Sequence, residues 1–529
     1  MVQASAALWR EPAASLYPRP VHRRLWITSS IALALACNSP SEGDDEVGDT
    51  SETDESASES SESASTSSDT SSDEGTIPED AAWVEVELGA AVNEVDERYL
   101  SYALDTDKVV YQQFDFERPR LLALTAELSP ALLRIGGTRA DQVYYDMSDT
   151  PLAEAPSGYE RVMDRATWDA ACDFAEALGV EMLFTINAGP GPRDDQGQWI
   201  DAQARELIEY TIARDCPVTV WEFGNEIGAF GLEHNYPLDG EQYAADFAVF
   251  AALVDEIDPD ARTAGPASMY WPLEGEIFVP IIEPLLAMQG ELVDIATWHY
   301  YPQQSSSCPV ATRGVDKPLF PLGWLDTIET WAAEVEGYRA THAPNAEVWL
   351  GETGHAQCGG EPGISNTFAS NFWWLDQLGR MALRDQPLAI RQALSGGAYN
   401  LIEDSMLEPA PDYYASVLWK RHMGPEVLAV QLQNAPEGLL AYAHCDVASD
   451  GAVVVLVINY DASASVPVAF LDGTLEFEAG ITDVAQPIVL VALEAALEEH
   501  VEDGALVALP QGAQARRSRS RRGRGNGRR

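Results

Sequence analysis

The sequence predicts an α/β fold, a (β/α)8 TIM barrel with a C-terminal β-sandwich domain. The chain has 529 residues, of which 46% are apolar, enough for one large domain and a smaller one. Between residues 99 and 396, eight apolar strand-like segments alternate with helical segments. Such alternation indicates a parallel sheet, and eight units in about 300 residues favour a closed barrel over an open sheet. From about residue 425, short apolar segments follow one another, which is typical of a sandwich.

The eight predicted barrel strands are short apolar runs bounded by turn residues. They cover residues 99–105, 131–137, 180–189, 218–226, 262–268, 293–302, 347–354 and 389–397. Helices are predicted over residues 119–130, 167–179, 202–215, 241–258, 322–342 and 366–384. The second of these helices has Thr167 at its start and Gly179 at its end, as helix boundaries often do. Together these elements place the barrel at residues 95–424.

The sandwich is expected to combine residues 82–94 with residues 425–511. The stretch "WVEVELGAAV" (83–92) alternates like a half-buried strand and has no helix after it. The later strands are predicted at 427–432, 439–445, 452–460 and 466–471, and a helix at 490–499.

The N-terminal 37 residues are predicted to be an export signal. Four arginines precede the apolar run "LWITSSIALALAC", which is too short to span a bilayer as an ordinary transmembrane helix. The run ends at Cys37 after "ALA", and this resembles a bacterial lipoprotein signal. Cys37 is therefore a predicted lipidation site on an outer-membrane or cell-surface protein. The alternative is secretion after cleavage nearby.

The charge is strongly unbalanced, with a formal net value of −53. Residues 38–79 are predicted to be a disordered tether, because they are Ser-rich and acidic and have almost no apolar content. The basic tail at 512–529 is interpreted as a disordered end, a polyanion-binding segment or the product of a shifted reading frame. The acidic body repels nucleic acid and anionic lipid, so no nucleic-acid partner is expected, and membrane contact only through Cys37.

Two glutamates end predicted barrel strands, where reactive residues of such barrels lie. Glu226 ends the fourth strand and Glu352 the seventh, so their carboxylates can face each other across the barrel mouth. A carboxylate pair roughly 5–5.5 Å apart is what retaining glycoside hydrolysis needs. Asn225, directly before Glu226, offers an amide to the sugar 2-hydroxyl. A strand-terminal Glu can also be a cap or a salt-bridge member.

Several ordered motifs resemble glycoside hydrolase family 79, the heparanase and β-glucuronidase family. They are "LSPALLRIGGTRADQVYYD", "FGNE", "VDIATWHYYP", "GETGHAQCGG" and the segment "AIRQALSGGAYNLIEDSMLEPAPDYYASVLWKRHMGPEVLAV". The resemblance covers residues 95–435 well and 436–510 loosely. It implies a barrel that cleaves glycosides with retention and needs neither a metal nor an organic cofactor.

The resemblance also implies roles for individual residues. Glu226 would be the acid/base, Glu352 the nucleophile, and Tyr301 the hydrogen-bond donor to the nucleophile, with Tyr300 as the neighbouring candidate. Asp105 and Thr138 would line the −1 sugar site, and Gly359, Gly360 and Tyr399 would hold a uronic acid carboxylate through backbone N–H groups and a phenol.

Some assignments stay open from the sequence. His299 is either a packed core histidine or a substrate contact, Tyr399 could be a core aromatic, and Gly136 and Gly137 could serve only a tight turn. Gln357 and Cys358 depart from the pattern of the mammalian relatives. Cys308 and Cys358 lie on the loops after strands 6 and 7, and we hypothesise a disulfide between them over the rim.

The function expected from the sequence is a retaining β-glucuronidase, exo or endo, acting on glucuronic-acid-containing glycans outside the cell. The alternatives are a related β-glycosidase for neutral sugars and an inactive surface glycan-binding protein. The presence of both Glu226 and Glu352 favours an enzyme. The acidic body lacks the basic patches expected around a heparan sulfate cleft, so a non-sulfated or lightly charged substrate is favoured.

Overall fold

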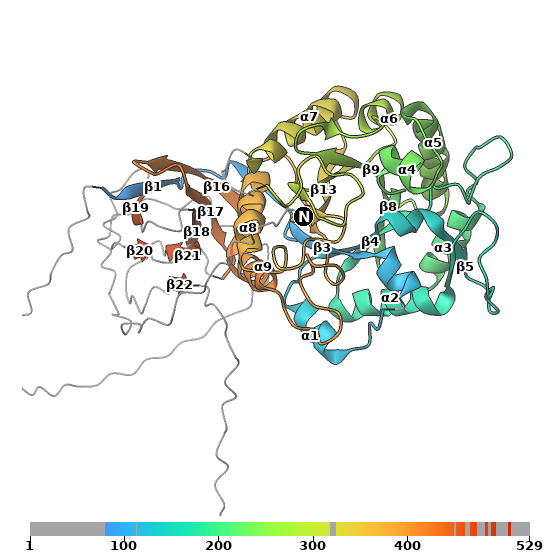
Figure 1. The fold of residues 1–529 in the computed structure, drawn as a ribbon, viewed down its shortest axis with the longest axis horizontal. Helices are drawn as coiled ribbons and strands as arrows, with labels where there is room; N and C mark the ends of the chain where they lie inside the picture. The colour runs from blue at the N-terminus through green and yellow to red at the C-terminus, as the bar shows by residue number, and fades with distance from the viewer. Residues whose placement is uncertain are drawn as a thin grey trace, which may run out of the picture.

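The computed structural model describes residues 80–112, 114–317, 324–448, 451–460, 466–472, 482–484, 488–493 and 506–508. The predicted export signal with Cys37, the acidic tether and the basic tail lie outside these residues. None of the helices described is both long enough and apolar enough to cross a membrane. The chain forms a barrel and a smaller β-domain, with α8 and α9 lying between them (Figure 1).

Eight parallel strands form the closed barrel, because the last strand of the pairing order, β8, also pairs with β9. All eight strands predicted from the sequence are confirmed. In chain order they are β3 (Leu100–Asp105), β4 (Leu132–Gly136), β7 (Glu181–Ile186), β8 (Val218–Phe223), β9 (Arg262–Trp271), β11 (Ile295–Tyr300), β13 (Glu347–Thr353) and β15 (Ala389–Arg391). The catalytic candidates on β8 and β13 therefore lie on strands 4 and 7.

The helices pack outside the barrel strands. They are α1 (Pro119–Ala126), α2 (Arg165–Leu178), α3 (Ala202–Ala213), α4 (Phe230–Glu233), α5 (Gly240–Ile257), α6 (Ile282–Gln289), α7 (Thr327–His342), α8 (Ala369–Ala382) and α9 (Pro411–His422). The six predicted helices are present, whereas α4, α6 and α9 were not predicted. Helix α2 begins earlier than predicted, because the Asp164 carboxylate caps it by accepting from the Thr167 N–H, and it ends at left-handed Gly179.

Short elements decorate the barrel loops. They are the parallel pair β5 (Val143–Asp146) and β6 (Arg161–Asp164), β10 (Gly275–Glu276) beside β9, the pair β12 (Gln303–Gln304) and β14 (Ala356–Gln357), and the single turns η1 (Asp107–Tyr111), η2 (Thr138–Gln142) and η3 (Ile227–Ala229). The pair β12–β14 links the loop after strand 6 to the loop after strand 7.

The second domain combines two N-terminal strands with strands from the C-terminal part of the chain. Its strands are β1 (Ala82–Glu87), β2 (Asn93–Glu94), β16 (Met423–Gln433), β17 (Leu439–Asp446), β18 (Val453–Asn459), β19 (Val466–Asp472), β20 (Thr482–Val484), β21 (Ile488–Leu493) and β22 (Leu506–Ala508). Strand β1 lies between β16 and β19. The helix predicted at 490–499 is wrong over its first four residues, which belong to β21 and pair with β18; the other six lie outside the described residues.

Strand β18 is apolar from Val453 to Ile458, and both of its faces are buried. Val453, Val455 and Val457 pack in the sandwich core with residues of β1 and β19. The alternate residues Val454, Leu456 and Ile458 belong to the large cluster that includes the barrel helices. One strand thus supplies the sandwich core on one face and the contact with the barrel on the other.

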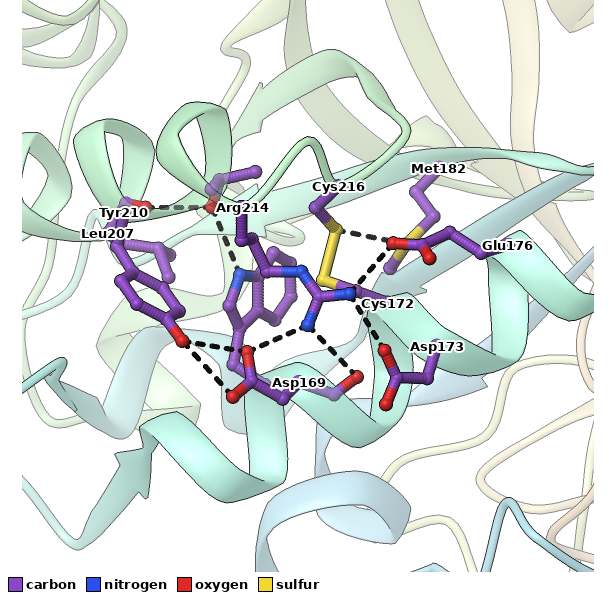
Figure 2. The surroundings of a disulfide bond; sticks show 11 residues. Asp169, Cys172, Asp173, Glu176, Met182, Leu207, Tyr210, Arg214 and Cys216 are labelled. Carbon is purple, nitrogen blue, oxygen red and sulfur yellow. Dashed lines mark hydrogen bonds and ion pairs between the residues drawn. A yellow bond between two sulfur atoms is a disulfide. The ribbon is translucent and has the colours of Figure 1, made fainter.

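Within the described residues two disulfides occur, one beside the start of β8 and one between the loops after β11 and β13. Cys172 of α2 is bonded to Cys216, two residues before β8, a pairing that was not predicted. Cys308 and Cys358, hypothesised to pair, are bonded between the loops after β11 and β13. The first disulfide lies beside Arg214 (Figure 2). This side chain contacts Asp169, Asp173 and Glu176 of α2 at 2.8, 2.9 and 2.7 Å.

Removal of either disulfide should destabilise the barrel by a similar amount. The paired cysteines are 44 and 50 residues apart in sequence, so the loops they close are similar in length. We expect each Cys→Ser double variant to lose about 4 kcal/mol of unfolding free energy by the loop-entropy estimate. Urea denaturation followed by tryptophan fluorescence measures it. A much larger loss for one pair would show that its loop also depends on the disulfide for its native packing.

Candidate active site

The two predicted catalytic glutamates face each other at the barrel mouth. Glu226 follows β8 and Glu352 lies near the end of β13, and both are buried, at 5% and 6% exposure. One carboxylate oxygen of each lies within 4.8 Å of the other. This closeness suits the roughly 5–5.5 Å separation of retaining glycosidases and not the roughly 6.5–9.5 Å of inverting ones.

The backbone of Glu226 is in the left-handed region, with φ 52° and ψ 49°. A non-glycine residue adopts this conformation only where its surroundings enforce it. Here the preceding Gly224 also has a positive φ of 69°, and the Glu226 N–H donates to the Ala267 carbonyl at 3.1 Å. The turn that ends β8 is therefore held against β9, which fixes where the Glu226 side chain begins.

Arg134 of β4 is the hub of the site. It is fully buried, and its guanidinium donates to Glu352 Oε2 and Asn225 Oδ1, both at 2.8 Å, and to Glu222 Oε2 at 3.0 Å. A buried cation bonded to Glu352 suits an ionised nucleophile. The role of Arg134 was not predicted, although a charged residue inside the apolar run "ALLRIGG" was a usable signal.

The hydroxyl of Tyr301 donates to Glu352 Oε1 at 2.5 Å, so both oxygens of this carboxylate are held. Tyr300 does not reach the site. Its hydroxyl lies 2.5 Å from Thr327 Oγ1 at the start of α7, and its ring packs near Trp298 in the core. The neighbouring tyrosines point in opposite directions, as successive residues at the end of a strand do.

His299 of β11 contacts the other glutamate. Its Nδ1 lies 3.1 Å from Glu226 Oε1, and its Nε2 lies 3.4 Å from Arg134 Nη2. Burial, with the Arg134 charge, holds the pKa of His299 well below its usual value, so the ring is neutral. Because Nε2 faces a donor, we assign the proton to Nδ1, which donates to Glu226 Oε1. His299 is therefore a positioning residue for Glu226.

The pKa of Glu226 is raised well above its usual value. Burial is the main cause, followed by the negative charges of Glu352 and Glu233, while Arg134 opposes the shift. Glu352, by contrast, lies against the Arg134 guanidinium at 2.8 Å. Two carboxyl groups with such different surroundings suit an acid and a nucleophile.

The side chain of Asn225 is fixed with its oxygen turned inward. Its Oδ1 accepts from Arg134 Nη2 at 2.8 Å and from the Gly137 N–H at 3.2 Å, and its backbone N–H donates to Asp141 Oδ2 at 2.9 Å. In the described part of the chain, the amide nitrogen has no hydrogen-bond partner. It is thus available to a ligand hydroxyl.

Asp105 and Thr138 lie at the ends of the first two barrel strands. Burial and the Glu352 charge raise the pKa of Asp105 to about 7. Gly137 has a φ of 88°, and a Cβ there would lie 2.2 Å from Asp105 Oδ1, so the close approach of these strands needs glycine. Thr138 follows at the start of η2 and is partly buried.

The glycine pair after β13 packs tightly against the loop after β15. The Gly359 carbonyl accepts from the Ala398 N–H at 2.6 Å, and a Cβ on Gly360 would lie 2.7 Å from the Tyr399 nitrogen. The Gly360 N–H already donates to the Ala356 carbonyl at 3.0 Å. In this conformation it therefore cannot donate to a substrate carboxylate, which was its expected role. Among the described residues, the Gly359 N–H has no acceptor.

Tyr399 is joined to the nucleophile through a second tyrosine. Its ring stacks on that of Tyr301 with centroids 6.3 Å apart and an interplanar angle of 30°. Tyr399 is buried, and the charges of Asp105 and Glu352 help to raise the pKa of its phenol, after burial itself. Tyr399 therefore borders the site rather than the outer core.

One cluster of possible metal ligands occurs in the part of the chain that the structure describes, namely Glu226, His299 and Glu352. This donor set does not suit a metal ion. The Arg134 guanidinium lies 2.8 Å from Glu352 Oε2, and the Tyr301 hydroxyl occupies the other oxygen of Glu352. A buried cation at this distance repels a second one.

Comparisons with known proteins agree with this geometry. Residues 84–379 match the profile "Glycosyl hydrolase family 79, N-terminal domain". Similar curated proteins are heparanase-like protein 1 of Arabidopsis thaliana, 29% identical over 72% of this chain and 74% of that protein, and heparanase of Mus musculus, 28% identical over 70% and 76%. The baicalin-beta-D-glucuronidase of Scutellaria baicalensis is 27% identical over 75% and 80%.

Solved structures share the fold at low sequence identity. The alpha-L-arabinofuranosidase of Thermotoga maritima superposes with a TM-score of 0.59 and 14% identity, over 78% of this chain and 96% of that chain. A family 44 xyloglucanase of Paenibacillus polymyxa gives 0.51 and 12%, over 78% and 97%. The fold, the glutamate pair and the family profile lead to one conclusion: the chain belongs to glycoside hydrolase family 79 and is a retaining glycoside hydrolase.

Proposed function

We propose that the protein is a β-glucuronidase that works by double displacement on glucuronic-acid-containing glycans. Glu352 attacks the anomeric carbon, while Glu226 gives its proton to the departing glycosidic oxygen. This yields a glycosyl ester on Glu352 and the free leaving group. Glu226, now ionised, takes a proton from water, and the resulting attack on the anomeric carbon releases the sugar and restores Glu352.

The arrangement of Gly359 and Tyr399 carries the assignment of the sugar. Among the described residues the Gly359 N–H has no acceptor, and the Ala398 contact holds its loop in place; the Tyr399 ring stacks on Tyr301. An N–H and a phenol suit a carboxylate oxygen each. The disulfide from Cys308 to Cys358, the residue before Gly359, restrains this loop further. The similarity to heparanase and to baicalin-beta-D-glucuronidase supports the same class of sugar.

A neutral-sugar β-glycosidase is the second candidate, and one observation favours it. The Gly360 N–H is already bonded to the Ala356 carbonyl, so only one of the two expected backbone donors is available. A site with fewer donors recognises a carboxylate less strongly. This candidate predicts faster turnover of a β-glucoside than of the matching β-glucuronide.

Replacing Tyr399 by Phe should distinguish the two sugars. We expect the wild type to hydrolyse 4-methylumbelliferyl β-glucuronide in preference to the β-glucoside. Tyr399→Phe should lose about 10- to 100-fold in kcat/KM on the glucuronide, the scale of one hydrogen bond to a charged group. Its kcat/KM on the glucoside should change little. A wild type that prefers the glucoside, or a variant that loses both activities equally, would contradict the proposal.

The pH dependence should report the raised pKa of Glu226. As pH rises through this pKa the acid loses its proton, so kcat/KM falls on the alkaline side. The Glu233 charge helps to raise this pKa, so Glu233→Gln should move the alkaline limb to lower pH. The control is His234→Asn. Burial lowers the pKa of His234 to about 4, so the ring is neutral and its loss should leave the limb in place. A Glu233→Gln profile identical to that of the wild type would refute this.

A further inference from the structure

The segment that follows Glu226 carries polar atoms that the catalytic steps do not use. Glu233 ends α4, and its Oε2 is buried without a hydrogen-bond partner among the described residues. The Nε2 atom of His234 is in the same situation, while its Nδ1 lies 3.1 Å from Gln142 Nε2. Buried polar atoms are nearly always satisfied, so these two neighbours need partners that the described residues do not supply.

A strained and exposed aromatic residue borders the same segment. Phe278 has a φ of 65°, which is an outlier for a bulky side chain, and it is 51% exposed. Its ring meets Trp271 edge-on with centroids 6.0 Å apart. A Cβ on Gly228 would lie 2.7 Å from the Val279 carbonyl oxygen, so the Phe278 loop packs directly on the turn after Glu226. Strain of this kind gathers at functional sites.

The barrel topology places this region opposite the sugar-binding candidates. Asp105, Gly359 and Tyr399 follow strands β3, β13 and β15, which are neighbours in the sheet. Glu233 follows β8, and Phe278 follows β9 and β10, on the other side of the barrel. Glu226, the proposed acid, follows β8, so a group attached to the oxygen that it protonates would extend toward the loops after β8 and β9.

The local charge on this side is acidic. Arg139 is the cation near Glu233, but it already binds Glu160 Oε2 at 2.9 Å and Gln142 Oε1 at 2.6 Å. Burial and the Glu352 charge raise the pKa of Glu233 to about 7. Near neutral pH, Glu233 is therefore ionised in some molecules, where it only accepts hydrogen bonds, and protonated in others, where it can also donate one. An anionic group placed here would meet both Glu233 and the catalytic pair.

We propose that Phe278 and Glu233 form the leaving-group subsite, which takes an uncharged ring with a flat apolar face and a hydroxyl. The Phe278 ring stacks on that face, and the Glu233 carboxylate accepts from the hydroxyl. A sulfated or uronate leaving group is disfavoured. The proposal rests on Glu226 as the acid of the proposed function, but not on which sugar occupies the −1 site.

Substrates with and without a ring in the leaving group test Phe278. The three substrates are an aryl β-glucuronide, a glucuronyl disaccharide with a neutral reducing-end sugar, and methyl β-glucuronide. Phe278→Ala should lose about tenfold in kcat/KM where a ring leaves and nothing on the methyl glycoside, and Phe278→Tyr should keep wild-type values. Loss on the aryl substrate alone identifies an aromatic leaving group, and loss on the disaccharide alone identifies a sugar. Equal loss on the methyl glycoside, or no loss on either ring, overturns the proposal.

A sulfated version of the disaccharide tests Glu233. The wild type should cleave it more slowly than the neutral disaccharide. Glu233→Gln should raise the sulfated-to-neutral ratio of kcat/KM by about 3- to 10-fold, an effect that shrinks at high salt. An unchanged ratio overturns the role of Glu233. If the wild type cleaves glucosides instead of glucuronides, the proposal that glucuronic acid occupies the −1 site is wrong. The same series of substrates made with glucose then still tests the leaving-group subsite.

Discussion

Glu352→Ala is expected to lose about 10⁶-fold in kcat, the scale seen when a covalent nucleophile is removed. Without the carboxylate no glycosyl ester forms, and water has no activated route to the same face of the sugar. The variant should stay folded. Arg134 keeps its contacts with Glu222 and Asn225, so its buried charge remains compensated.

Added azide separates the two glutamates by stereochemistry. In Glu352→Ala, azide can enter the space of the lost carboxylate, attack the anomeric carbon and give the inverted glycosyl azide. In Glu226→Ala, an aryl leaving group departs without acid help, and azide then attacks the glycosyl ester to give the product of retained configuration. Proton NMR of the anomeric signal identifies each product. Exchange of the two outcomes would reverse the assignment of nucleophile and acid/base.

The barrel was predictable because each of its strands is a short apolar run followed by a helix or loop. The helix prediction for residues 490–499 is wrong over its first four residues for a related reason. The run "LVAL" is apolar in either structure, and its pairing with β18 and β22 makes it a strand. Tertiary context decides such short runs. Helices α6 and α9, which follow strands 5 and 8, were missed.

Site residues could be predicted from the sequence only where their position at the end of a strand places them at the barrel mouth. Glu226 and Glu352 end their strands, so the barrel brings them together. The contacts of Arg134 and His299 depend on residues that converge from four different strands, which no local pattern shows. The hydrogen bond from the Gly360 N–H to the Ala356 carbonyl depends on the local turn at residues 356–360.

Arg134→Ala is expected to destabilise the protein by about 3–5 kcal/mol, the cost of leaving a buried carboxylate without its partner. Glu222 is fully buried, and after the substitution it would keep only the Thr185 hydroxyl, at 2.7 Å, as a donor among the described residues. Glu352 would lose its contact of 2.8 Å with the guanidinium. Activity should therefore fall together with stability.

Arg380→Ala is the matched control. Arg380 binds the buried Asp376 at 3.0 Å near the sandwich, its ion-pair partners among the described residues do not include Glu226 or Glu352, and Asp376 keeps the Tyr442 hydroxyl at 2.5 Å. We expect this variant to lose stability but to keep its turnover per folded molecule. Urea denaturation and active-site titration at low temperature measure the two quantities separately. Arg134→Ala that retains wild-type turnover would refute the role assigned to this guanidinium.

The contrast between the two arginines bears on why the barrel contains so many buried charges. Replacing a buried ion pair by apolar residues is often neutral or stabilising, so stability alone does not account for the network around Arg134. Its guanidinium spans Glu222, Asn225 and Glu352, and each contact fixes a group that the reaction uses or supports. If Arg134→Lys restores much of the stability but little of the activity, the fork geometry of the guanidinium, and not its charge alone, is what orients the nucleophile and Asn225.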